Sequence, residues 1–212
     1  MRRFRFLSLL LTSTLVLSSS TALAENNWPG WRGPLGTGHS NEKGLPVEWS
    51  QDDVVWKTEL PGFGQSSPVV WKDRIFLTSA LENGRQRIVF CVERASGKIL
   101  WQQVAWNGSP EQTHRMNMFA SATCATDGER VVAFFGRGGL HSYDLDGKHQ
   151  WSCDLGQFAG PWGTAASPII VGDLVIQNCD AEEESFIAGV NKKTGKEVWR
   201  TPLEKLRGWS TP

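Results

Sequence analysis

Several patterns are scarce in this chain of 212 residues, and each scarcity excludes a class of structure or partner. No stretch shows a sustained helical period, which argues against an α-helical or α/β domain. Lys plus Arg and Asp plus Glu number 22 each, so the chain carries no net charge. We therefore expect neither a nucleic acid nor an anionic membrane surface as partner.

The cysteines and histidines lack metal-binding spacing, so no metal site is expected. None of the four cysteines forms a close C-x-x-C pair, and no two are adjacent. Three disulfide pairings remain open to them, but small buried strand residues are the favoured interpretation. The residues are Cys91, Cys124, Cys153, Cys179 and His39, His114, His141, His149.

Residues 1–24 have the features of a signal peptide. Arginines at the start precede an apolar run, Leu7 to Leu17, and Ala22-Leu23-Ala24 forms a small-residue cleavage site before Glu25. The apolar run is too short and too rich in serine for a membrane span. The sequence predicts export to the periplasm or the extracellular space, where disulfides are permitted; an uncleaved anchor is the alternative.

Residues 25–53 form an arm rich in Gly, Pro and Trp. The stretch from Asn27 to Gly38 holds too many glycines and prolines for a regular element. Trp28 and Trp31 stand close together, so we expect an ordered arm in which these side chains cover something.

Tryptophan is abundant, at 11 residues against a single tyrosine, and part of the excess is periodic. Gly-Lys-x-x-Trp occurs three times, and a fourth tryptophan, Trp56, precedes the first copy at a similar spacing. Each glycine follows a turn, where a positive φ costs glycine little. A Trp required once per unit indicates packing between stacked units rather than ligand binding. The structural residues are Gly97, Gly147, Gly195, Trp56, Trp101, Trp151 and Trp199.

Three units of four short strands surround these motifs. Runs of β-branched and aromatic residues alternate with turn residues, which predicts antiparallel meanders at about 66–106, 118–156 and 165–204. Val54 to Thr58 would be a lone fourth strand, and Ser210-Thr211-Pro212 matches the start of another unit. Because such stacks need closure or capping, we expect the chain to be the N-terminal part of a longer protein.

The motif Asn191 to Trp199, with Ser-x-Pro strand starts and Gly-Asp turns, resembles the repeat of PQQ-like (pyrroloquinoline quinone) β-propellers. The resemblance covers roughly residues 54–212 and implies an all-β propeller of four-stranded antiparallel blades, about three of them complete here. An eight-bladed ring is expected in the full-length protein. The second unit has a shorter turn before Gly147, and the first has Ser96 in place of Thr.

Two functions are compatible with this resemblance. The first is an exported, non-catalytic binding or assembly scaffold with a protein or cell-envelope partner, as in BamB-type outer-membrane assembly proteins. The alternative is part of a periplasmic quinone-dependent alcohol dehydrogenase holding PQQ and calcium. No catalytic or cofactor-binding residue can be assigned, since no base is recognisable and the adjacent cysteines common in such dehydrogenases are missing.

The connections between units are the expected place for a binding site, because propeller loops surround the central channel. His114 and Asn117 lie in the longest connection, between the first and second units. A tryptophan also recurs shortly before a unit start, at Trp162 and Trp209. The candidates are His114, Asn117, Trp162 and Trp209.

Overall fold

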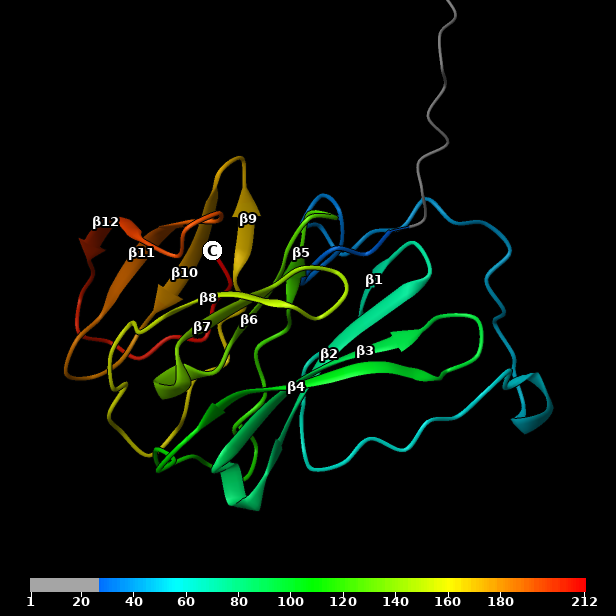
Figure 1. The fold of residues 1–212 in the computed structure, drawn as a ribbon, viewed down its shortest axis with the longest axis horizontal. Coiled ribbons are helices and arrows are strands. Elements are labelled where there is room, and N and C mark those ends of the chain that lie inside the picture. Colours follow the sequence, from blue (N-terminus) through cyan, green and yellow to red (C-terminus); the bar gives the residue numbers. More distant parts are fainter. Residues whose placement is uncertain (1–26) are drawn as a thin grey trace, which may run out of the picture.

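The computed structural model describes residues 27–212, which form three separate four-stranded antiparallel sheets. They lie side by side in chain order, like adjacent propeller blades (Figure 1). The predicted all-β architecture is confirmed. The strands are β1 (Val69–Trp71), β2 (Arg74–Leu81), β3 (Gln86–Glu93), β4 (Ile99–Asn107); β5 (Ala125–Thr126), β6 (Val131–Phe134), β7 (Leu140–Tyr143), β8 (His149–Cys153); β9 (Ile169–Val171), β10 (Leu174–Cys179), β11 (Phe186–Asn191) and β12 (Glu197–Pro202).

Three single-turn 3-10 helices are the only helical segments among residues 27–212: η1 (Gln51–Asp53), η2 (Glu82–Gly84) and η3 (Gly136–Gly138). No helix in this range is long and apolar enough to cross a membrane. The segment predicted as a signal peptide, residues 1–24, lies outside the described residues.

The core consists of two apolar layers, one on each face of the middle sheet. Side chains alternate between the faces of a strand, so β6 contributes to both layers. Val131 and Ala133 pack with Phe76 of the first sheet, whereas Val132 and Phe134 pack toward the third. All four residues of β6 are therefore buried, and the sequence there is continuously apolar rather than alternating.

A β-bulge recurs in every sheet just before the repeated tryptophan. In the first sheet Cys91 pairs with Trp101 but Val92 pairs with Ile99, which leaves Leu100 as the extra residue. The other two sheets shift register at the same place, with Gln150 and Val198 as the extra residues. Since a bulge re-aims the following side chain, it sets the direction of each tryptophan.

Each of the first three repeat tryptophans lies against the glycine turn of the following unit. The indole N–H of Trp101 donates to the Leu145 carbonyl at 2.9 Å, and that of Trp151 to the Lys192 carbonyl at 2.8 Å. A Cβ on Gly147 or Gly195 would lie 2.7 Å from the corresponding ring.

Trp56 makes the same contact with the first sheet. It donates to the Arg94 carbonyl at 2.9 Å, and Gly97 faces its ring. Trp199 lies over Gly189 of its own sheet and is only half-buried.

Two predicted strands differ in the structure. Val54 to Thr58 joins no ladder, although Trp56 and Thr58 still bond to the first sheet. The first strand of the unit predicted at 118–156 is shorter than expected, because Ser121 to Cys124 is irregular and the strand is confined to Ala125–Thr126. In both places side-chain contacts and single hydrogen bonds hold the backbone, so β propensity alone overestimated the ladder.

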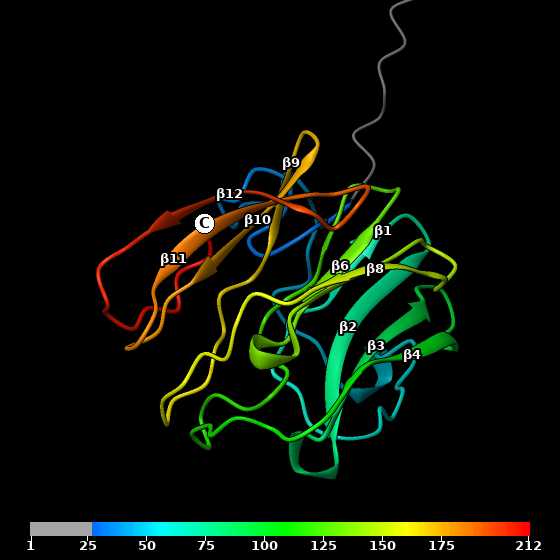
Figure 2. The same cartoon turned by 60° about the vertical axis from the view of Figure 1, so that its left-hand side comes forward.

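The first strands of the three sheets approach one another, with β5 in contact with both β1 and β9. The N-terminal arm lies over this inner side, as the blue segment beside β1 and β5 shows (Figures 1 and 2). Trp28 exchanges two backbone hydrogen bonds with Val70, and the Pro29 carbonyl accepts one from Thr126. The arm thus fastens the first sheet to the second.

Candidate functional site

Hydroxyl groups form a ladder across the inner side of the sheets. The Ser67 N–H donates to Thr123 Oγ1 at 3.0 Å, and the Thr123 N–H donates to Ser167 Oγ at 2.9 Å. The Ser167 N–H in turn donates to Thr211 Oγ1 at 3.2 Å. Because each hydroxyl accepts from the preceding unit, the ladder links successive strand starts across the blades.

A cavity of about 370 Å³ lies beside this ladder, and we call it the inner pocket. Its lining joins the N-terminal arm, the segments before β1, β5 and β9, and the end of the chain. No lining residue carries a charge. They are Trp31, Gln65, Met116, Asn117, Ser121, Thr123, Ala165, Ser167, Trp209 and Thr211.

The lining is held by a compact set of hydrogen bonds around Gln65. Its Oε1 accepts from the Met118 N–H and from Ser121 Oγ, both at 2.9 Å. Its Nε2 donates to the Met116 carbonyl at 3.2 Å. The Gln65 amide is therefore occupied in shaping the connection before β5 rather than free for a ligand.

Three of the four candidate residues lie together. The rings of His114 and Trp162 are 5.2 Å apart, and Asn117 Nδ2 donates to the Trp162 carbonyl at 2.7 Å. Asn117 also lines the inner pocket, as does the fourth candidate, Trp209, whereas the other two do not. The structure thus places the candidates on two adjoining sites, with Asn117 shared.

The connection that carries His114 and Asn117 is fixed by a buried arginine. Arg87 is fully buried and pairs with Glu111 at 2.8 Å, while its Nε and Nη1 donate to the Gly84 and Phe119 carbonyls. Its guanidinium also stacks on Phe119, 4.6 Å from the ring centre. Burial lowers the pKa of Arg87, against the opposing effect of Glu111.

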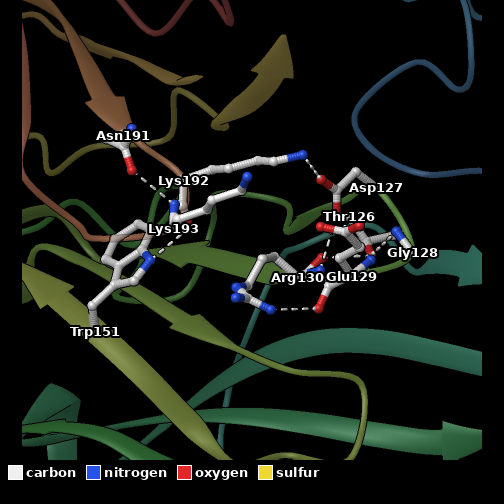
Figure 3. Close-up of polar contacts among 9 residues, drawn as sticks. All are labelled: Thr126, Asp127, Gly128, Glu129, Arg130, Trp151, Asn191, Lys192 and Lys193. Atoms are coloured by element: carbon white, nitrogen blue, oxygen red, sulfur yellow. Dashed lines mark hydrogen bonds and ion pairs between the residues drawn. The ribbon is translucent and has the colours of Figure 1, made fainter. Parts of the chain in front are cut away.

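A second charged contact joins the middle and third sheets, between the turn after β5 and the turn after β11 (Figure 3). Lys192 Nζ lies 2.7 Å from Asp127 Oδ2, and the Lys192 carbonyl accepts the Trp151 indole. Burial alone would raise the pKa of Asp127, but hydrogen bonds from Lys192 and from the Arg130 and Glu129 backbone hold it below its ordinary value. This pair is structural, because both partners serve the contact between sheets.

A histidine chain lies on the face of the middle sheet toward the first. His141 Nε2 lies 2.7 Å from the Gly138 carbonyl, so this nitrogen is the donor and Nδ1 is the acceptor. Ser152 Oγ then donates to His141 Nδ1 at 2.9 Å and accepts from His149 Nε2 at 2.8 Å. Burial lowers the pKa of His141 to about 4, so the ring is neutral at pH 7. It is a structural histidine, too weak a base for acid–base catalysis near neutrality.

The cysteine thiols belong to the two apolar layers. Cys91 and Cys124 pack between the first and middle sheets, and Cys179 with Cys153 between the middle and third. Burial raises the pKa of Cys91 and Cys124 to about 12. Among residues 27–212 no cluster of three His, Cys, Asp or Glu side chains has the arrangement of a metal site.

Comparison with known families identifies the repeat. The family model PQQ_2, described as outer membrane protein assembly factor BamB, matches residues 40–159, more than half of the chain. The chain belongs to this family of PQQ-like β-propellers. No curated protein matched the chain in a sequence search.

Solved propellers superpose on the chain at low sequence identity. A quinohemoprotein alcohol dehydrogenase from Comamonas testosteroni aligns with a TM-score of 0.61 and 16% identity, over 84% of this chain and 27% of its own. BamB from Moraxella catarrhalis aligns with a TM-score of 0.50 and 16% identity, over 73% of this chain and 44% of its own.

A europium-containing methanol dehydrogenase aligns with a TM-score of 0.49 and 17% identity, over 66% of this chain and 26% of its own. The PQQ-like chain therefore spans less than half the length of each of these three structures. At such identities the likeness concerns the fold.

Sequence reasoning missed most of the inner pocket. The hydroxyl ladder did leave a signal, because a Ser or Thr precedes the proline in Ser67-Pro68, Ser167-Pro168 and Thr211-Pro212. Trp31 was expected only to cover an unspecified surface, and Gln65 gave no signal, since they come from the arm and from a connection outside the repeat. Their proximity to Trp209 depends on how the sheets stack.

Proposed function

We propose that this PQQ-like propeller is an exported, non-catalytic binding or assembly scaffold whose ligand contacts the inner side of the sheets. The inner pocket carries the proposal, because its volume lies in the range of ligand sites and its lining combines two part-exposed indoles with hydroxyl and amide groups. The expected partner is a protein or another component of the cell envelope, in line with the description of the matched family.

The alternative is a quinone-dependent dehydrogenase, for which the likeness to the Comamonas enzyme is the specific reason. PQQ is a tricarboxylate, so a site for it needs cationic or other anion-binding groups, and calcium prefers carboxylate oxygens. The inner pocket offers neither, since every lining residue is uncharged. The residues of the inner pocket therefore do not fit this cofactor, and we derive no reaction step through it.

Export is part of the proposal and rests on the sequence of residues 1–24. Expression in a bacterial host should yield a mature chain that begins at Glu25 in the periplasmic fraction. N-terminal sequencing of that fraction checks this, and an intact Met1 start in the cytoplasmic fraction would contradict it.

Titration of the purified protein with PQQ and calcium separates the two functions. We expect no saturable binding heat and no change in quinone absorbance. Stoichiometric, saturable uptake would refute the scaffold proposal in favour of the dehydrogenase. Exchange of Thr211 for Ala serves as the matched control, because a signal that this pocket variant leaves unchanged would come from elsewhere on the chain.

A further inference from the structure

The two indoles of the inner pocket provide flat apolar platforms. Trp31 and Trp209 are 45% and 47% exposed, and both line the inner pocket. An indole presents a large apolar face together with one polar N–H. Such platforms suit a ligand with flat apolar faces and a polar rim, and the C–H faces of pyranose rings meet that description.

The hydroxyl ladder supplies unused donors beside these platforms. The hydroxyl oxygens of Thr123, Ser167 and Thr211 each accept a backbone N–H. Their hydroxyl protons meet no acceptor within residues 27–212. A hydroxyl can donate one hydrogen bond while it accepts others. The ladder can therefore donate to ring and hydroxyl oxygens of a ligand.

Asn117 adds the complementary chemistry. Its Nδ2 donates to the Trp162 carbonyl, whereas its Oδ1 is buried and has no partner in the described part of the chain. A buried acceptor without a donor is costly, and because Asn117 lines the inner pocket, a ligand hydroxyl can supply the missing donor. Sugars carry donors and acceptors together, whereas a peptide backbone alternates them at a fixed spacing.

The charge and the extent of the cavity restrict the ligand further. The absence of charge from the lining disfavours acidic sugars, which would lose their hydration without an ionic partner. A second cavity of about 770 Å³ shares Trp31, Trp209 and Thr211 with the inner pocket and continues along the arm, where Arg32 is the one charged residue of its lining. This extent fits a chain of several sugar units better than a monosaccharide.

From these observations we infer that the inner pocket binds a neutral oligosaccharide stacked on Trp31 and Trp209 and hydrogen-bonded by the hydroxyl ladder. The inference rests on the proposed function, since it takes the inner side of the sheets as the binding surface and names its ligand. No covalent step is involved.

Calorimetric titration of the protein with neutral hexasaccharides tests the inference. The probes are cellohexaose, xylohexaose, maltohexaose and mannohexaose, with a hexamer of galacturonic acid as the charged counterpart. We expect saturable binding of at least one neutral probe and a much weaker interaction with the charged one. Exchange of Trp31 or Trp209 for Ala should weaken binding about tenfold or more, as for aromatic hot spots.

Three controls make the outcome decisive. Trp49→Ala removes an indole that is 71% exposed and does not line the inner pocket, so binding should not change. Trp209→Phe keeps an aromatic platform and should recover part of the affinity, which a purely structural defect would not predict. Circular dichroism confirms that each variant is folded.

Three outcomes would each overturn the inference. Either no neutral probe binds, or the exchanges of Trp31, Trp209 and Trp49 have equal effects, or the charged hexamer binds as tightly as the neutral probes. The scaffold proposal has a separate outcome, because PQQ uptake rather than sugar binding decides between the scaffold and the dehydrogenase. If the protein binds neither sugars nor PQQ, the oligosaccharide inference fails and the scaffold proposal stands.

Discussion

The contact between Trp101 and Gly147 allows the packing of one blade on the next to be measured. Gly147 has φ +85°, and a Cβ placed there would lie 2.7 Å from the Trp101 ring. Gly147→Ala therefore combines two costs, a left-handed backbone of about 1 to 2 kcal/mol and overpacking against the indole of about 1 to 3 kcal/mol. We expect the free energy of unfolding to fall by about 2 to 5 kcal/mol.

Gly172 provides the matched control. It also has a positive φ, of +58°, but nothing lies within 4 Å of its potential Cβ. Gly172→Ala should cost only the backbone part, about 1 to 2 kcal/mol. Urea unfolding followed by circular dichroism measures both values, and the difference between them isolates the contact with the tryptophan.

A double-mutant cycle completes the measurement. Trp101→Ala alone should cost about 3 to 5 kcal/mol, as for other large-to-small exchanges in a core. In that background Gly147→Ala no longer meets a ring, so its cost should fall to the value at Gly172. Equal costs at Gly147 and Gly172, or full additivity of Trp101→Ala and Gly147→Ala, would refute the proposed packing.

Three further predictions concern buried polar groups and thiols. Burial lowers the pKa of His141 from 6.5 to about 4, so the unfolded state binds more protons and stability falls as pH drops below 6.5. Between pH 7 and pH 4 the wild type should lose about 3 kcal/mol more stability than His141→Gln in urea titrations. Parallel pH profiles of the two proteins would contradict this. Glu111→Ala leaves the buried Arg87 without its carboxylate and should lower the free energy of unfolding by about 3 to 5 kcal/mol. The control Glu204→Ala removes an exposed carboxylate and should cost under about 1 kcal/mol in the same assay. Similar values for the two variants would disprove the role of the pair. Iodoacetamide should modify the half-buried Cys153 before the buried Cys91, Cys124 and Cys179, as peptide mass mapping can show, and early labelling of Cys124 would contradict the packing.

The candidate site was only partly predictable. His114, Asn117, Trp162 and Trp209 were chosen because they lie in connections between units, and the structure places two of them in the inner pocket. Arg87 shows why the rest was missed. It is the second residue of β3 and resembles an ordinary exposed strand residue, yet the folding of residues 108–119 over it makes it fully buried.

The repeat itself was fixed by local chemistry. Turn glycines, β-branched runs and one tryptophan per unit specify hairpins at short range, so the four-stranded sheets follow from the sequence alone. The sequence does not show where each tryptophan points, because this depends on the bulges at Leu100, Gln150 and Val198. Nor does it show the partners of Trp31, Gln65 and Thr123, which come from distant segments. The sequence alone determined the blades, whereas only their stacking, driven by apolar layers shared between sheets, decided where the inner pocket lies and which groups line it.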